Sequence, residues 1–197
     1  VALLVVAVAA FAQLSNPSFP KLTGQIVDEA GLLTQADKSE ILQRLRELEG
    51  KSTDQVVVVT VRSLQGYAVE DFAIRLARHW KIGQQGTDNG VVLLIAPNDR
   101  KVRIEVGRGV EGQLTDAMSA LIINNAILPA FRRGEFAIGI KAGVRDIADV
   151  LLGDAEAVKQ RAARLKARDS GIDPAAVMFL LFSANGVSRL VRGESIF

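Results

Sequence analysis

The feature that most constrains the fold is a pair of short apolar runs. Residues 55–62 read QVVVVTVR and residues 90–96 read GVVLLIA, so both runs are apolar at odd and even positions. That pattern is typical of strands that are covered on both faces. Between the runs, Phe72, Leu76 and Trp80 recur at helical spacing. Two buried strands joined by a helix predict a βαβ unit, in which the strands are parallel and the crossover is right-handed.

A helix is predicted before this unit and a hairpin after it. Thr34 begins the helix with Asp37 as its capping-box partner, and Gly50 is expected to end it. Residues 97–100 read PNDR, which is turn chemistry. Residues 101–106 (KVRIEV) then alternate charged and apolar side chains. This alternation predicts a strand that is antiparallel to its predecessor and has one face in water.

Two further helices complete the predicted domain. The first runs from about residue 115 to residue 128 and is closed by Pro129, and the second covers roughly residues 136–152. Helices then stand on both sides of the strands. The predicted fold class is α/β, a three-layer α/β/α sandwich with a small mixed sheet that ends near Gly153.

The first residues have the character of an export signal. Residues 1–12 are an uninterrupted apolar run, long enough for a signal-peptide core and too short to span a bilayer. Ala10 and Ala12 supply the small residues that a signal peptidase reads, which places cleavage before Gln13. We therefore expect a signal-peptide remnant over 1–12, a linker over 13–18, and an exported, periplasmic or otherwise extracytoplasmic protein.

The last residues combine a basic run with a short apolar segment, and both are compatible with contact to a membrane surface. Residues 154–174 are predicted to form a charged helical stalk in solvent, although its basic run over 159–168 could instead contact anionic lipid head groups. Residues 175–197 form an apolar stub and tail. The stub, AAVMFLLF over 175–182, is too short to cross a bilayer, so a truncated anchor and an interfacial segment both stay open.

Composition limits the chemistry. The 197 residues carry a net charge of +2, which argues against nucleic acid as a partner. There is no cysteine and only one histidine, which removes thiol catalysis, Fe–S clusters and thiolate zinc sites. We expect neither haem nor zinc. A bound ion would be held mainly by oxygen, which favours Ca²⁺ or Mg²⁺.

Residues 107–112 read GRGVEG and fit G-x-G-x-x-G, the pattern of a dinucleotide-binding loop. That site needs the following helix to lead into a second parallel strand. Here Pro129 and another helix follow instead, so a nucleotide is not expected. The glycines are predicted to serve a sharp turn that needs positive φ.

Short oxygen-bearing side chains precede the strand at 90–96. They are Thr87, Asp88 and Asn89, and turn chemistry alone could explain them. Glu111 and Asp116, however, follow the antiparallel strand at 101–106. Since one strand begins after Asp88 and the other ends before Glu111, both loops should emerge at the same sheet edge. We therefore predict a cation site made by Asp88, Glu111 and Asp116, with Thr87 and Asn89 in support.

Several blocks in order resemble the TPM domain family over residues 19–153. They are Phe19-Pro20, Leu22-Thr23-Gly24, Val27-Asp28, Trp80-Lys81-Ile82-Gly83, GTDNGV at 86–91, RIEVG at 103–107, Gly109, Glu111-Gly112, Leu114-Thr115-Asp116 and Ile127-Leu128-Pro129. Position 108 is Arg where relatives commonly have an aromatic residue. The resemblance implies an exported α/β/α sandwich, often followed by a membrane segment. It also implies Ca²⁺ binding at acidic loops in some members and acid phosphatase activity in a plant member.

Two functions follow as hypotheses. The first is an exported module that supports the assembly or maintenance of a membrane protein complex, with a membrane protein or the membrane surface as partner. It carries the predicted divalent cation, and Asp28 is an additional supporting residue. The alternative is a metal-dependent, acid phosphatase-like phosphomonoester hydrolase, in which Arg103 or Arg108 would hold the phosphate because Arg binds phosphate bidentately.

Overall fold

The sheet is the layer on which everything else is built. The computed structural model describes residues 17–169, so the expected signal remnant, most of the linker and the segment after residue 169 lie outside the described residues. Four strands pair in the order β1-β2-β3-β4. They are β1 (Ile26–Asp28), β2 (Gln55–Thr60), β3 (Gly90–Ala96) and β4 (Lys101–Val106). The first three are parallel and β4 runs antiparallel to β3, which confirms the βαβ unit and the hairpin.

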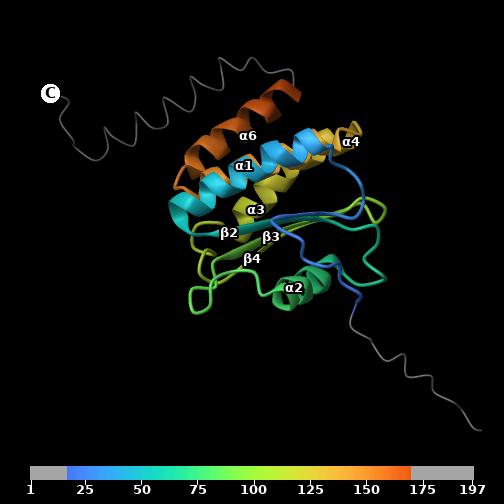
Figure 1. Ribbon diagram of the computed structural model, residues 1–197. Helices are drawn as coiled ribbons and strands as arrows, with labels where there is room; N and C mark the ends of the chain where they lie inside the picture. The colour runs from blue at the N-terminus through green and yellow to red at the C-terminus, as the bar shows by residue number, and fades with distance from the viewer. Residues whose placement is uncertain (1–16, 170–197) are drawn as a thin grey trace, which may run out of the picture.

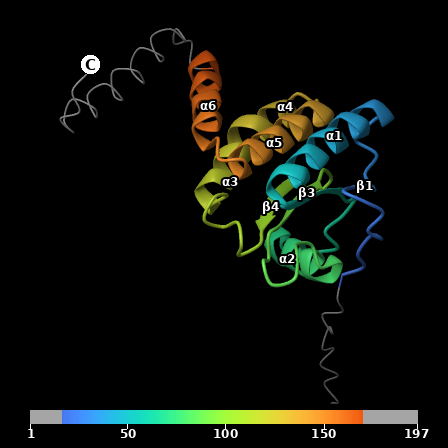
Figure 2. The ribbon, with the colours of Figure 1, turned by 60° about the vertical axis from the view of Figure 1, so that its left-hand side comes forward.

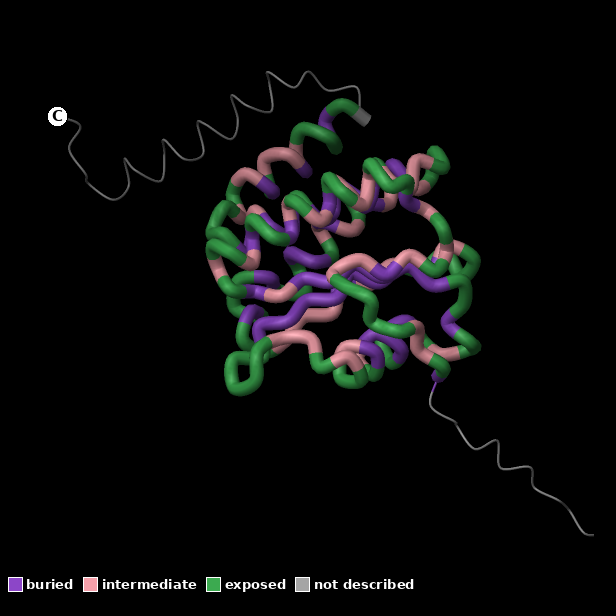
Figure 3. The backbone as a smooth tube through the Cα atoms, in the orientation of Figure 1, coloured by how far each residue is buried: buried purple, intermediate pink, exposed green. Residues whose placement is uncertain are grey.

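Helices cover both faces of this sheet, as Figure 1 shows. One face carries α2 (Val69–Trp80) over a core that includes Phe72 and Leu94. The other face carries α1 (Gln35–Ser52), α3 (Asp116–Ile122) and α5 (Phe136–Leu151) over a larger core. Every residue of β3 is buried between the two layers, and Figure 3 shows the buried strands at the centre of the molecule. The three-layer α/β/α prediction is confirmed.

The edge strand β4 differs from its prediction. Residues directly opposite each other in a ladder share a face, and Glu105 and Arg103 lie opposite Val92 and Leu94. Val92 and Leu94 belong to the core beneath α2. The charged face of β4 is therefore partly covered by α2, and Glu105 and Arg103 are only partly exposed. The alternation alone could not show that a helix lies over this face.

Helix boundaries show where local rules are sufficient. Thr34 and Asp37 form the predicted capping box at the start of α1. The helix continues past Gly50 to Ser52, and Thr53 ends it in the left-handed conformation with φ of 67°. A glycine inside a helix costs about 1 kcal/mol relative to alanine, which the packing of three buried residues of α1 outweighs.

Pro129 does not close the helical path, contrary to the prediction. After α3 the chain widens into a π-helical turn, η1 (Ile123–Ile127), and then continues as α4 (Leu128–Arg132). Pro129 lies in the first turn of α4. Proline fits there because its φ is fixed near the helical value and the π-helical turn directly before it already departs from the regular hydrogen-bond pattern of an α-helix.

The predicted stalk packs on the domain where it is described. It forms α6 (Ala155–Asp169), in which Val158 and Ala162 are buried, so this part is not a fully solvated helix. Arg161 binds Asp146 of α5 at 2.9 Å. Figure 2 shows α6 joined to the layer that contains α5. Within residues 17–169, no helix combines the length and the apolar character needed to traverse a bilayer.

The opposite end of the described chain packs on the α2 layer. The ring of Phe19 meets the ring of Phe72 edge-on, with 5.3 Å between the centroids. The indole N–H of Trp80 donates to the carbonyl of Pro20 over 3.0 Å. The segment before β1 is thereby fixed to α2.

Asp28 is a structural anion at the carboxyl end of the parallel strands. Its carboxylate accepts hydrogen bonds from the hydroxyl of Thr60 at 2.6 Å and from the backbone N–H groups of Leu32 and Leu33. Lys38 lies 3.2 Å away, and the Asp28 side chain is 1% exposed. Asp88 precedes β3 at the other end of the sheet, so Asp28 does not support the predicted cation site.

The pKa of Asp28 reflects these contacts. Burial acts to raise it, but the hydrogen bonds from Thr60, Leu32, Leu33 and Lys38 outweigh burial and hold it below the ordinary value of 3.8. A carboxyl whose pKa is lowered by folding stabilises the fold at pH values above its unfolded pKa. That contribution is lost as the pH falls through the folded-state pKa.

We expect Asp28→Asn to lower the free energy of unfolding by about 1–3 kcal/mol at pH 7, because an amide cannot accept all of these bonds. The deficit should shrink as the pH falls from the ordinary value of 3.8 toward the lower folded-state pKa of Asp28, because protonation removes the charge that accepts these bonds. Urea unfolding at pH 7 and pH 3 measures both values. The neighbouring exposed carboxyl gives the control variant Glu29→Gln, and an equal deficit at both pH values would contradict the assignment.

Candidate functional site

Two loops meet at the amino-terminal end of β3, as the strand directions predict. The backbone N–H of Gly107 donates to the carbonyl of Gly90 over 2.7 Å, and that of Gly109 donates to the carbonyl of Asp88 over 3.0 Å. The acidic turn before β3 and the glycine-rich loop after β4 are therefore joined by their main chains. Asp88 itself has φ of 53°, and one of its carboxylate oxygens accepts the backbone N–H of Arg108 at 3.2 Å.

The glycines serve a different purpose from the predicted one. Gly107, Gly109 and Gly112 do not have positive φ. A Cβ atom on Gly107 would lie 2.2 Å from the carbonyl oxygen of Asp88, and one on Gly109 would lie 2.0 Å from that of Thr87. Two of the glycines are required because the loops touch, not because the chain turns.

Asn89 holds the acidic turn in place and does not face a ligand. Its side chain is buried, where it accepts the N–H of Gln84 at 2.9 Å and donates to the carbonyl of Thr53 at 3.0 Å. Thr87 contributes its backbone, whose N–H donates to the carbonyl of Gln84. Both residues shape the loop, and the structure assigns neither side chain to a site.

A pocket of about 310 Å³ lies beside these loops, between the end of α2 and β4. It is lined by charged side chains of both signs. The acids are Asp88, Glu105 and Glu111, and the bases are Arg78, Lys81 and Arg108. The loops bring Asp88 and Glu111 to one pocket, as predicted, and α2 adds two bases that the sequence did not suggest.

Glu105 is the residue of this pocket whose protonation is most affected by its surroundings. Burial raises its pKa above the ordinary value of 4.5, while Arg103, 3.2 Å away, opposes that shift. The charge of Asp116 adds to the increase. The partner of Arg103 is thus an acid on its own strand, so its role as a phosphate contact would require that this pair opens.

Asp116 is the predicted ligand that the structure leaves apart. It is the first residue of α3, acts on Glu105 through its charge and is not among the residues that line the pocket. Across residues 17–169, no three Asp, Glu, His or Cys side chains are grouped closely enough to hold a metal ion. Of the three acids that line the pocket, Glu105 is paired with Arg103, which leaves Asp88 and Glu111; two carboxylates can bind only a hydrated cation that also takes water and backbone ligands.

Another pocket, of about 530 Å³ between α1 and α5, is less suited to a ligand. Its bases, Arg44, Lys141 and Arg145, are already paired with acids of α1 or α5. Lys141 binds Asp37 at 3.1 Å and Glu40 at 2.9 Å, and Arg44 binds Asp149. These ion pairs join the two helices.

The family is decided by a comparison with known sequence families. Residues 26–150 match the model of the TPM domain, which is more than half of the chain. The chain belongs to the TPM domain family. The match begins at β1 and ends within α5, so it includes both loops of the charged pocket and stops before α6. Among curated proteins, none matches the chain.

Solved structures agree with this assignment. The chain is similar to the N-terminal domain of a protein from P. gingivalis, with 37% identity, a TM-score of 0.62, and coverage of 67% of this chain and 84% of that one. BA42 from Bizionia argentinensis is 22% identical with a TM-score of 0.55, covering 62% and 83%. The N-terminal domain of cg2496 from Corynebacterium glutamicum is 19% identical with a TM-score of 0.53, covering 67% and 82%. The last two show the fold alone.

The loop contact of this TPM domain can be tested with two alanine variants. Gly109→Ala should lower the free energy of unfolding by about 1–3 kcal/mol, because its Cβ would overlap the Thr87 carbonyl and push the loops apart. Gly112→Ala is the matched control, since its Cβ would meet nothing within 4 Å. Urea unfolding measures both. Equal stability of the two variants would show that the loops separate without cost.

Proposed function

We propose that this TPM domain is an exported binding module that takes up a divalent cation at the charged pocket and supports a membrane protein complex. The observation that carries the proposal is the pairing of two loops whose backbones are hydrogen-bonded to each other, each of which presents a carboxylate to the same pocket. The apolar segments 1–12 and 175–182 support an exported, membrane-associated setting.

The cation would be Ca²⁺ or Mg²⁺, which prefer oxygen ligands. Asp88 and Glu111 would hold it from the two loops. One oxygen of Asp88 is already engaged by a backbone N–H, which fixes the direction of the carboxylate and leaves its second oxygen for the ion. Because both loops are exposed and Glu105 is already paired with Arg103, only two carboxylates of the pocket are left for the ion, and the affinity should be in the range of extracellular modules, about 10⁻⁴–10⁻³ M.

A binding role fits the pocket better than turnover does. The side chains that line it include no serine, threonine, cysteine or histidine that could act as a nucleophile. Glu105 lies opposite a buried valine and is paired with Arg103 on its own strand. A cation joining two loops would instead rigidify the face that a partner meets.

One observation favours the alternative, a metal-assisted phosphomonoester hydrolase. Arg78, Lys81 and Arg108 line the same pocket as the two carboxylates, so phosphate-binding groups stand beside a cation-binding edge. Arginine forks match phosphate oxygens, and a bound ion would activate water in such an arrangement. The position of Arg78 and Lys81 at the end of α2 is what brings them there.

Calorimetric titration of the full chain with CaCl₂ and MgCl₂ tests the cation. Asp88→Asn and Glu111→Gln should each weaken Ca²⁺ binding by about tenfold, since each variant removes a charge and a ligand. Glu156→Gln removes an exposed carboxylate from α6 and should leave the affinity unchanged. Wild-type affinity in both loop variants would place the ion elsewhere.

Hydrolysis of p-nitrophenyl phosphate, followed with and without a chelator, tests the alternative. If the pocket is catalytic, Arg108→Gln should lower kcat/KM by at least about tenfold, because a charged contact to the phosphate is lost. Arg46→Gln, on the exposed side of α1, is the control with the same change of charge. No phosphate release by the purified wild-type chain, with Ca²⁺ or Mg²⁺ present, would leave the binding module as the function.

A further inference from the structure

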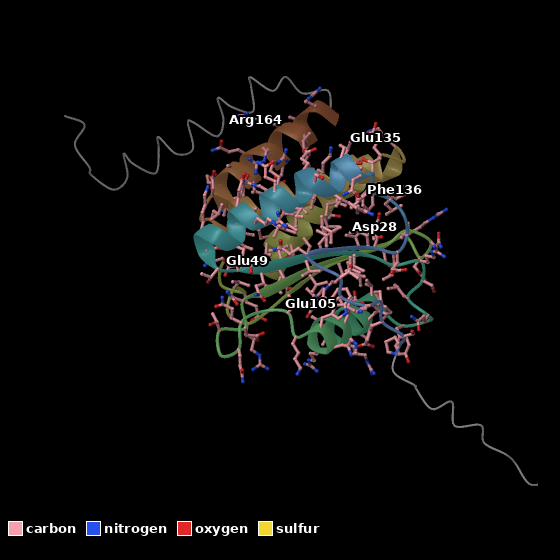
Figure 4. The ribbon with its side chains drawn as sticks, viewed as in Figure 1. Asp28, Glu49, Glu105, Glu135, Phe136 and Arg164 are labelled. Atoms are coloured by element: carbon pink, nitrogen blue, oxygen red, sulfur yellow. The ribbon has the colours of Figure 1, made fainter. Side chains whose placement is uncertain are left out.

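A second pocket, of about 450 Å³, lies at the other end of the sheet. It is formed by the end of β3, the turn into β4, α4 and the first residue of α5. Leu128, Phe131 and Phe136 make its apolar wall, and the two rings pack with 4.9 Å between their centroids. Figure 4 shows Phe136 and Asp28 toward one end of the molecule and Glu49 and Glu105 toward the other. The apolar pocket is therefore separate from the charged pocket.

Three bases line this apolar pocket, and no acid does. They are Arg100 and Lys101 from the β3–β4 turn and Arg132 from the end of α4. The nearby carboxylates are already engaged. Asp99 accepts the backbone N–H of Leu64 at 3.0 Å, and Glu135 binds Arg133 at 2.7 Å.

The three bases thus have no counter-ion in the part of the chain that the structure describes. None of Arg100, Lys101 and Arg132 forms an ion pair among residues 17–169, and all three are exposed. The β3–β4 turn and α4 therefore both place positive charge at the apolar pocket. A ligand that fills the hollow needs an apolar body and an anionic head, because the wall offers dispersion contacts and the rim offers only cationic donors.

We propose that this pocket binds a small single-chain carboxylate, with its hydrocarbon chain against Leu128, Phe131 and Phe136 and its head between the three bases. The volume is that of a small-molecule pocket and accommodates a short to medium acyl chain, which favours a small ligand over a macromolecule. The site lies at the carboxyl end of β3, where open α/β sheets bind their ligands. It does not depend on the function proposed for the charged pocket.

Calorimetric titration of the full chain with octanoate tests this site. We expect saturable binding of one octanoate per chain, which weakens as salt is added because the rim charges are screened. Octylamine has the same hydrocarbon chain with the opposite charge and should bind at least about tenfold more weakly. Affinity should also increase by about fourfold per methylene from butanoate to octanoate, as burial of the chain requires.

Variants locate the binding. The double variant K101Q/R132Q should lose roughly tenfold or more in octanoate affinity, since it removes two charged contacts. Lys51→Gln changes an exposed base at the other end of the sheet and is the control. Equal affinity for octylamine, an affinity that ignores chain length, or an unchanged affinity in the double variant would each overturn the proposal. A short peptide ending in leucine that binds where octanoate does not would overturn it too, by identifying a chain terminus as the ligand.

Discussion

The structure depends on the burial of β2 and β3 on both faces. Neither strand has a polar side, so each face of the pair must be covered by a helical layer. α2, the crossover between the strands, covers one face, and the helices before and after the unit cover the other. The same pairing places the start of β3 beside the end of β4. The charged pocket thus forms where α2, which covers one face of the strands, ends beside the start of β3 and the end of β4.

The contact between the two loops adds the local order that a binding site needs. Gly107 and Gly109 have no Cβ atom, so the backbones of the two loops come close enough for their N–H and carbonyl groups to form hydrogen bonds. The buried side chain of Asn89 holds the acidic turn through three hydrogen bonds, to Gln84, Thr53 and Asp54. The carboxylates of this edge are therefore carried by loops with a defined main chain, and a ligand would not have to order them first.

The sequence predicted the layers well because they follow from periodicity. The runs at 55–62 and 90–96, the capping box at Thr34 and the hairpin at 97–100 are all local patterns, and each is confirmed. The three-residue strand β1 is too short to carry a period and was missed. The site was predicted less well because it depends on long-range packing. Nothing near Arg78 in the sequence indicates that α2 ends beside β4. Asp28 has a carboxylate that could bind a cation, but Thr60 and Lys38 already bind it.

The two ends of the described chain leave from opposite sides of the sandwich. The first residues are held to α2 through Phe19, whereas α6 packs on α5 in the other layer, and Figure 2 shows α2 and α6 on opposite sides of the sheet. The charged pocket takes part of its wall from α2, so it lies on the side of the sandwich that holds the first described residues. A molecule that binds this pocket therefore approaches the face of the domain opposite to α6.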